Sequence, residues 1–203
     1  MRVLVTGGGG FLGKAIAGLL VEKGFDVISY SRNEYPELKK LGVKHLKGDL
    51  NNITALTDAM EGCDSVFHVA AKAGIWGPYE EFYNANVTGT ENVLIACRKL
   101  GIKKLVYTST PSVVFSDGGI EGGDESLPYP DKCDSHYQKT KTIAEKMVLK
   151  ANNQNLSTVS LRPHLIWGPG DHHFLPRLVS KARAGKLRII GNNYDIMMLP
   201  MKL

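Results

Sequence analysis

Tyr137 and Lys141 stand four positions apart, a spacing that places both side chains on one face of an α-helix. An ammonium group near a tyrosine favours the phenolate form, and a tyrosine whose pKa is lowered in this way can exchange a proton with a substrate oxygen. Thr110, or less favourably Ser109, would hydrogen-bond to the same oxygen. These residues predict proton transfer to or from a hydroxyl or keto group, with Thr110, Tyr137 and Lys141 as the catalytic set.

The Tyr137 pair begins the apolar stripe of a predicted helix over residues 135–152, where exposure to solvent does not explain polar residues. A second pair with the same spacing, Tyr35 and Lys39, flanks Pro36 and has no hydroxyl-rich strand end beside it. We therefore assign the chemistry to Tyr137 and Lys141.

Three glycines, Gly7, Gly10 and Gly13, lie between an apolar strand that starts near Val3 and an amphipathic helix that ends at Gly24. Side chains at the first two positions would block backbone N–H groups from phosphate oxygens, and the third lets the helix lie close to the strand. The pattern predicts a pyrophosphate-binding turn for a dinucleotide.

Arg32 bears on the choice of cofactor because it follows the second predicted strand, 25–30. An acid at this point would accept from the 2′-hydroxyl of NAD, whereas an arginine suits the 2′-phosphate of NADP. The chain has no acid there before Glu34. We expect NADP(H), with NAD(H) as the alternative. The alternative to a role in cofactor choice is that Arg32 is a solvated loop residue.

Asp49, after the third predicted strand, would either accept from the adenine amino group or cap a helix that starts at Asn51 or Asn52. His68, in the fourth strand, is expected to be a core histidine rather than a ligand. Small residues at the end of that strand leave space for the cofactor. The full set assigned to the cofactor is Gly7, Gly10, Phe11, Leu12, Gly13, Arg32, Asp49, Leu50, Ala70, Ala71, Lys72, Tyr137 and Lys141.

Strands and helices alternate along the chain, which predicts an α/β fold: a Rossmann-type doubly wound parallel sheet with helices on both faces. Strands are expected at 65–71, 104–110, 157–161 and 187–190, and helices at 79–100 and 174–184. Residues 1–165 would form the NAD(P)-binding domain, and residues 166–203 the start of a substrate-binding region.

Composition excludes several other classes of protein. The net charge is +5, from 25 basic and 20 acidic residues without a basic run, so nucleic acid is not an expected partner. Three separated cysteines suggest reduced thiols, and His172 and His173 are adjacent without a second ligand spacing, so we expect no metal. With the first strand at Met1 and no long apolar run, we expect a cytoplasmic protein without a membrane span. A homodimer is possible.

Further segments resemble one enzyme superfamily over nearly the whole chain. They are Gly48-Asp49-Leu50, His68-Val-Ala-Ala71, Asn86-Val-Thr-Gly-Thr90 and Tyr107-Thr-Ser-Thr110. With the glycine turn and the Tyr137 pair they resemble the extended short-chain dehydrogenase/reductases. Residues 72–77, 110–115 and 161–171 resemble the 3β-hydroxysteroid dehydrogenase/isomerase branch, and within it the bacterial 2-alkyl-3-oxoalkanoate reductases.

The resemblance implies NADPH-dependent reduction of a β-keto acid to a β-hydroxy acid, or chemistry on a 3β-hydroxysteroid-like lipid. It also implies that Pro163 and Leu165 lie beside the nicotinamide. Members of the superfamily continue for about a hundred further residues, so we expect an incomplete substrate region from a truncated or frameshifted gene, or a deliberately shortened chain. The alternatives are a nucleotide-sugar epimerase or dehydratase, and a non-catalytic NADP-binding protein.

Overall fold

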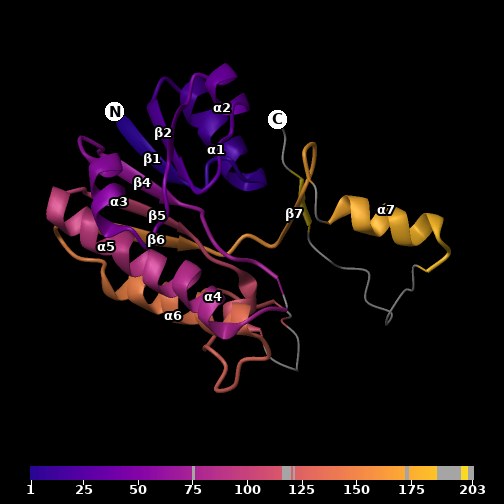
Figure 1. The fold of residues 1–203 in the computed structure, drawn as a ribbon. Coiled ribbons are helices and arrows are strands. Elements are labelled where there is room, and N and C mark those ends of the chain that lie inside the picture. Colours follow the sequence, from indigo (N-terminus) through magenta and orange to yellow (C-terminus); the bar gives the residue numbers. More distant parts are fainter. Residues whose placement is uncertain (75, 116–119, 121, 172–173, 187–197, 201–203) are drawn as a thin grey trace. The chain divides into compact units, whose positions relative to one another are not determined.

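The computed structural model describes residues 1–74, 76–115, 120, 122–171, 174–186 and 198–200. The chain divides into two compact units, Met1–Arg162 and Pro163–Leu203. The first unit contains one parallel sheet with its helices, and the second contains a short helix and two short strands (Figure 1). Each unit is described by itself.

The sheet of the first unit has the strand order β3-β2-β1-β4-β5-β6, and every neighbouring pair is parallel. Val3 of β1 pairs with Val27 of β2 on one side and with Ser65 of β4 on the other. The order therefore reverses between β1 and β4, which confirms the predicted doubly wound fold and marks the edge where such folds bind ligands. The strands are β1 (Arg2–Thr6), β2 (Asp26–Ser31), β3 (Lys44–Lys47), β4 (Ser65–His68), β5 (Lys104–Thr108) and β6 (Ser157–Leu161).

Helical segments connect the strands as the alternation predicted, with one difference. The expected continuous helix over 79–100 contains a five-residue π-helical segment, so the chain makes two α-helices around it. Strands β4 and β5 end at His68 and Thr108, so residues 69–71 and 109–110 lie beyond the sheet. The segments are α1 (Phe11–Glu22), α2 (Glu37–Lys40), α3 (Ile53–Met60), α4 (Tyr79–Tyr83), π-helical η1 (Asn84–Thr88), α5 (Gly89–Leu100), 3₁₀-helical η2 (Pro111–Val114) and α6 (His136–Lys150).

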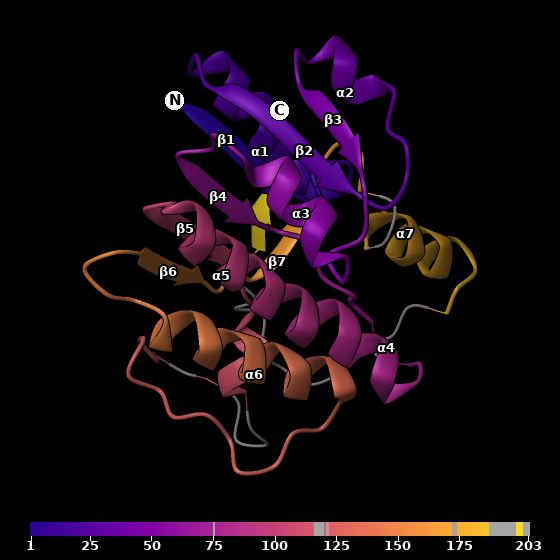
Figure 2. The ribbon, with the colours of Figure 1, turned by 60° about the vertical axis from the view of Figure 1, so that its left-hand side comes forward.

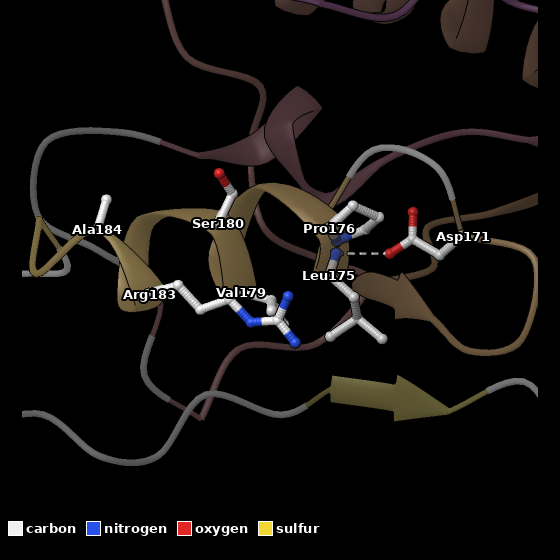
Figure 3. Close-up of a pocket in the computed structure, with 7 residues that line it drawn as sticks. All are labelled: Asp171, Leu175, Pro176, Val179, Ser180, Arg183 and Ala184. Atoms are coloured by element: carbon white, nitrogen blue, oxygen red, sulfur yellow. Dashed lines mark hydrogen bonds between the residues drawn. The ribbon is translucent and has the colours of Figure 1, made fainter.

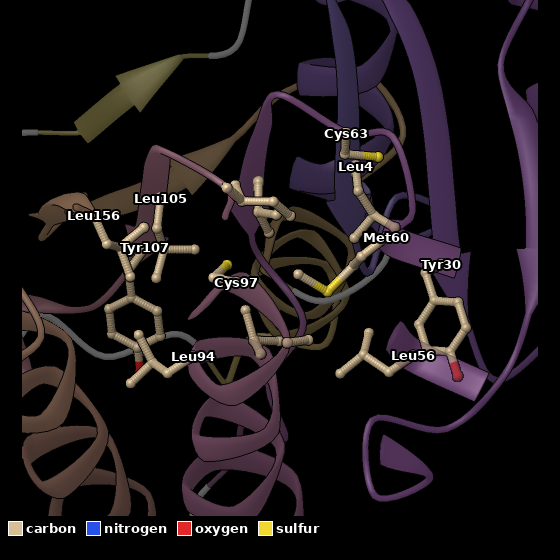
Figure 4. Packing of buried hydrophobic residues seen from close by; sticks show 14 of the residues in the cluster. Leu4, Tyr30, Leu56, Met60, Cys63, Leu94, Cys97, Leu105, Tyr107 and Leu156 are labelled. Carbon is tan, nitrogen blue, oxygen red and sulfur yellow. The ribbon is translucent and has the colours of Figure 1, made fainter. Parts of the chain in front are cut away.

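Two apolar clusters cover the two faces of the sheet. Along β1, Leu4 belongs to the larger cluster with α3, α5 and α6, whereas Val3 and Val5 belong to the cluster with α1 and α2. Successive residues of a strand point to opposite faces, so a strand buried on both sides must be apolar throughout. Figure 2 shows α5 and α6 side by side on their face, and Figure 4 shows the larger cluster, with Met60 and Leu94 reaching toward the sheet.

The second unit contains α7 (Leu175–Arg183) and the parallel pair β7 (Leu165–Trp167) and β8 (Met198–Pro200). Asp171 accepts from the backbone N–H groups of Phe174 and Leu175 at 3.0 and 2.8 Å, which fixes the start of α7. Leu175, Val179 and Arg183 line one side of a hollow along this helix (Figure 3). The strand predicted at 187–190 lies outside the described residues. Within the described part of the chain, no helix is long and apolar enough to cross a membrane.

We predict that Gly13→Ala lowers the free energy of unfolding by about 1–3 kcal/mol, because a Cβ atom at this position would overlap the carbonyl oxygen of Gly7. Gly18→Ala on the same helix is the matched control. Its Cβ would meet nothing closer than the Leu41 side chain at 3.9 Å, so the alanine should stabilise the helix by roughly 0.5–1 kcal/mol. Urea unfolding of both variants tests the difference, and equal effects would contradict the close approach of helix and turn.

Candidate functional site

The glycine turn sits at the point where the strand order reverses. Gly7 has φ +70°, a conformation that favours glycine, and its N–H donates to the Tyr30 carbonyl at 2.9 Å. A Cβ atom at Gly7 would come within 2.9 Å of the backbone of Ala70. Only glycine therefore allows the ends of β1 and β4 to approach each other this closely.

Helix α1 starts directly from this turn. Gly10 is its N-cap residue and provides no side-chain acceptor, and the first turn contains no acidic residue. Phe11 and Leu12 are the first helical residues, and both are half-buried. Their backbone N–H groups belong to the first turn of the helix, which favours an anion. The turn and the helix start have the shape and polarity that a pyrophosphate needs.

His68, at the end of β4, links the glycine turn to the rest of the site through buried hydrogen bonds. Its Nδ1 lies 2.7 Å from Thr6 Oγ1, and its Nε2 lies 3.0 Å from Thr90 Oγ1. Because Thr90 donates its own proton to the Asn86 carbonyl at 2.6 Å, Thr90 must accept from Nε2–H. Nδ1 then accepts from Thr6, whose oxygen also accepts from the N–H groups of Val69 and Ala70.

His68 is fully buried, and burial, followed by the charge of Lys141, lowers its pKa to about 3. All its polar atoms are satisfied by neighbours, which confirms the expected core histidine. The neutral imidazole therefore has a structural function at the strand end where residues assigned to the cofactor from the sequence lie.

Asn86, on η1, extends the same chain of hydrogen bonds to α6. Its side chain accepts from the Lys72 N–H at 2.7 Å and donates to the Lys72 carbonyl at 3.1 Å and to Thr140 Oγ1 at 3.0 Å. Thr140 in turn donates to the carbonyl of His136 at 2.8 Å. The glycine turn, the loop after β4 and the first turn of α6 are thus connected through buried polar groups.

Helix α6 holds Tyr137 and Lys141 on its first two turns, with Ser135 as the N-cap residue. Lys141 is only 2% exposed. Its Nζ donates to the Thr108 carbonyl at 2.7 Å and lies 4.1 Å from the centre of the Tyr107 ring. Burial lowers the pKa of Lys141 to about 7, although the charge of Glu145 raises it. The amino group therefore lies at the carboxyl end of β5.

Tyr137 is partly buried, and this burial raises the pKa of its phenol, while the neighbouring Thr110 hydroxyl acts in the opposite direction. From the sequence we expect Lys141 and a bound oxidised nicotinamide together to lower this pKa, and that stays a prediction. In the chain by itself, burial of the phenol acts in the opposite direction. Thr110 is 9% exposed and caps η2 by accepting from the Ser112 N–H at 3.2 Å. Ser109, the alternative hydroxyl, is 4% exposed.

Glu145 was not among the residues predicted from the sequence, although it lies one turn after Lys141. Its carboxylate is fully buried and accepts from Tyr129 Oη at 2.8 Å, Ser160 Oγ at 3.0 Å and Arg162 Nη2 at 2.6 Å. These donors lower the pKa of Glu145 despite its burial. The spacing from Lys141 was the one signal in the sequence that pointed to it.

Asp49 is exposed, and its Oδ1 accepts from the backbone and side-chain N–H groups of Asn51, both at 2.8 Å. The cap of α3 is Asn52, which accepts from the Ala55 N–H at 3.1 Å. The capping alternative for Asp49 is therefore wrong, because Asp49 closes the turn before the helix. A contact with adenine stays a prediction.

The remaining predicted residues of the first unit lie around the same edge of the sheet. Arg32 is exposed directly after β2, and Leu50 is half-buried. Lys72 pairs with Glu81 at 2.8 Å, and Ala71 beside it is exposed.

Three further predictions concern Tyr35 and Lys39, two residues of the second unit, and two adjacent histidines. Tyr35 packs on Gly9 and on His45, whereas Lys39 is exposed on α2. Pro163 and Leu165 belong to the second unit, so their place beside a nicotinamide stays a prediction. His172 and His173 lie outside the described residues.

Comparison with known proteins gives related enzymes. The model of the 3-beta hydroxysteroid dehydrogenase/isomerase family matches residues 4–197. A 2-alkyl-3-oxoalkanoate reductase of Stenotrophomonas maltophilia is 51% identical over 95% of this chain and 59% of its own length. A protein of the same name from Shewanella oneidensis is 50% identical over 94% of this chain and 51% of its own length. The chain thus spans little more than half the length of these relatives.

Among solved structures, MoeE5 in complex with UDP-glucose and NAD is similar at a TM-score of 0.79. It is 30% identical, and the match covers 92% of this chain and 62% of that one. This similarity extends the agreement from sequence to the arrangement of the whole parallel sheet.

The buried His68 makes the stability of the fold dependent on pH. The unfolded chain takes up a proton on this histidine near pH 6.5, whereas the folded protein resists protonation until about pH 3. Acidification through this window therefore favours unfolding, by about 1.4 kcal/mol per pH unit from this group. In His68→Gln we expect this part of the pH dependence to disappear, as measured by urea unfolding between pH 7 and pH 4. The exposed His136→Gln is the control, and identical slopes in all three proteins would contradict the prediction.

Proposed function

Because the chain belongs to the 3-beta hydroxysteroid dehydrogenase/isomerase family, we propose that it contains the cofactor-binding and proton-transferring part of an NADP(H)-dependent oxidoreductase. The reaction would interconvert a secondary hydroxyl and a ketone. The observation that carries this proposal is that Lys141 Nζ donates to the Thr108 carbonyl at the carboxyl end of β5 at 2.7 Å, with Tyr137 one turn earlier on α6 and Thr110 two residues after the same strand.

Each of these side chains has a role that its surroundings support. A nicotinamide supplies the hydride for reduction, or accepts it in the reverse direction. Burial keeps the Tyr137 phenol protonated at neutral pH, which is the form that donates a proton to a keto oxygen. The Thr110 hydroxyl would hold that oxygen, and the Lys141 amino group would hold the ribose hydroxyls and favour the phenolate that remains.

The glycine turn supports the cofactor part of the proposal. The helix start has no side-chain cap, and a Cβ atom at Gly7 would come within 2.9 Å of the Ala70 backbone. Because glycine stands there, phosphate oxygens would meet N–H groups rather than side chains. Ala70 and Ala71 would border the same space. NADP(H) is favoured over NAD(H) because exposed Arg32 follows β2 where an acid would suit NAD.

For the substrate we propose a β-keto or β-hydroxy acid, or a 3β-hydroxysteroid-like lipid. The names of the two reductases at 51% and 50% identity support the acid. Residues 1–165 would bind the cofactor, and residues 166–203 would begin the substrate region, with Pro163 and Leu165 beside the nicotinamide.

Two alternatives remain worth testing in the same assay. The similarity to MoeE5, whose structure contains UDP-glucose and NAD, favours a nucleotide-sugar epimerase or dehydratase. MoeE5 is 30% identical to this chain, which is less than the identity of the reductases. A non-catalytic NADP-binding protein is the other alternative. Turnover of UDP-glucose but not of a 2-alkyl-3-keto acid would support the first, and NADPH binding without any turnover would support the second.

We also propose that the chain can form a homodimer. Large apolar side chains are exposed on three neighbouring helices: Tyr83 on α4 is 40% exposed, Ile95 on α5 is 43% exposed, and Leu149 on α6 is 45% exposed. Apolar surface of this kind favours association.

The cofactor preference predicts that NADPH binds more tightly than NADH. Arg32→Ala should remove most of the difference, because a charge-assisted contact is worth roughly 1.5–3 kcal/mol. Titration by the fluorescence of the reduced nicotinamide measures both affinities. Arg98→Ala, at an exposed arginine on α5, is the control for loss of one positive charge. Equal affinities in the unmodified protein would refute the preference.

Tyr137→Phe should abolish reduction of a 2-alkyl-3-keto acid and leave the affinity for NADPH nearly unchanged, because only the transition state uses the hydroxyl proton. The readouts are kcat/KM, from the loss of NADPH absorbance, and the binding titration. Tyr35→Phe is the matched control, since Tyr35 begins the other Tyr-x-x-x-Lys pair and packs on Gly9. A larger loss in Tyr35→Phe would show that the wrong pair was chosen.

A further inference from the structure

Gln138 is a buried amide to which the proposed reaction gives no part, although it follows Tyr137 directly on α6. It is 3% exposed, and its side chain is hydrogen-bonded through both of its polar atoms. Oε1 accepts from the Asp134 N–H at 2.6 Å, and Nε2 donates to the Phe115 carbonyl at 3.0 Å. These partners fix the orientation of the amide, because an N–H group can only donate and a carbonyl can only accept.

The bond to Phe115 joins α6 to the segment that follows β5. Phe115 lies 23 positions before Gln138 and ends η2, where its N–H donates to the Ser112 carbonyl at 3.2 Å. At the start of η2, the Ser112 N–H donates to Thr110 Oγ1 at 3.2 Å, and the Val113 N–H donates to the Thr110 carbonyl at 3.3 Å. A continuous series of hydrogen bonds therefore runs from the Gln138 amide to Thr110.

The other end of the amide belongs to the start of α6. The backbone N–H of Gln138 donates to Oγ of the N-cap residue Ser135 at 3.1 Å, and Oε1 holds the N–H of Asp134 just before the cap. One residue thus fixes both the end of η2 and the first turn of the helix that carries Tyr137. The position needs a donor and an acceptor on the same side chain, which an amide provides.

We propose that Gln138 is a positioning residue, which holds the Thr110 hydroxyl at the distance from Tyr137 that the reaction requires. The inference rests on the proposed function, in which Thr110 holds the keto oxygen and Tyr137 gives it a proton. Two hydroxyl groups can serve one substrate oxygen only if η2 and α6 keep a fixed separation, and the Gln138 amide spans that separation. A merely structural Gln138 would stabilise the fold without affecting the rate of the folded protein.

The test is Gln138→Met in the full chain, because methionine has a similar length without an N–H donor or a carbonyl acceptor. With η2 released, kcat for a 2-alkyl-3-keto acid should fall by roughly 10- to 100-fold, since a displacement of about 1 Å can have an effect of this size. The affinity for NADPH should stay close to that of the unmodified chain. The side chain of Gln138 bonds to Asp134 and Phe115, and neither residue is assigned to the cofactor.

Ser135→Ala is the matched control for a weakened helix start. It removes the N-cap side chain of α6 but leaves the Gln138 amide and its bond to Phe115. Its kcat should stay close to that of the unmodified chain, at a temperature where thermal unfolding shows that both variants are folded. Equal losses of kcat in Ser135→Ala and Gln138→Met overturn the proposal, as does an unchanged kcat in Gln138→Met.

A double-mutant cycle shows whether Gln138 acts through Thr110. Thr110→Val removes the hydroxyl that Gln138 is proposed to place, so adding Gln138→Met to it should cost little further kcat. The same fold-loss in both backgrounds overturns the proposal, because independent effects multiply. If Gln138→Met fails to fold, Gln138→Asn takes its place, since it keeps an amide that is too short to reach both partners.

Failure of the proposed function gives a different result from failure of this inference. An unmodified chain that reduces no keto acid refutes the proposed reaction, and the positioning role with it. An unmodified chain that reduces the acid, but at the same rate with and without the Gln138 amide, refutes the positioning role alone.

Discussion

The buried hydrogen bonds of His68 constrain the whole carboxyl edge of the sheet. They join Thr6 at the end of β1 to Thr90 on α5, and Asn86 continues the connection to the loop after β4 and to Thr140 on α6. Around His68, the order of the bonds follows from the Thr90 proton, which goes to the Asn86 carbonyl. Shifting any of these elements would leave buried polar groups unpaired, at about 1–3 kcal/mol each. The glycine turn and the start of α6 are thereby held in one geometry.

Much of the fold could be predicted because each strand between two helical layers must be apolar on both faces, as the run from Val3 to Val5 is. The π-helical turn at 84–88 could not be predicted. Apolar spacing averages over a helix and does not detect one extra residue in a turn, and the contacts of Asn86 with Lys72 depend on a loop that only the fold brings near. For β4 and β5 the sequence predicted strand ends that lie beyond those in the structure. After β4, Val69 and Ala70 look like strand residues, although their N–H groups donate to Thr6 Oγ1.

The residues of the candidate site were easier to predict than their electrostatics. Helical spacing is enough to put Tyr137 and Lys141 on one face of α6, and the glycine pattern is enough to indicate a turn. The direction of a pKa shift depends on burial and on partners distant in sequence. Thr108 engages the Lys141 amino group from 33 residues away, and Arg162 reaches Glu145 from 17 residues away. No local pattern predicts such partners, and none shows that burial raises the pKa of Tyr137 in the chain by itself.

Burial shifts the pKa values of Tyr137 and Lys141, the proposed catalytic pair, in opposite directions. Desolvation favours the neutral form of each group, so it raises the pKa of Tyr137 and lowers that of Lys141. A pair in which both members are neutral keeps the proton on the phenol, which is the form that donates to a keto oxygen. The Thr108 carbonyl accepts from the Lys141 amino group whether or not that group is charged. Strand β5 therefore fixes the position of the amino group independently of its charge.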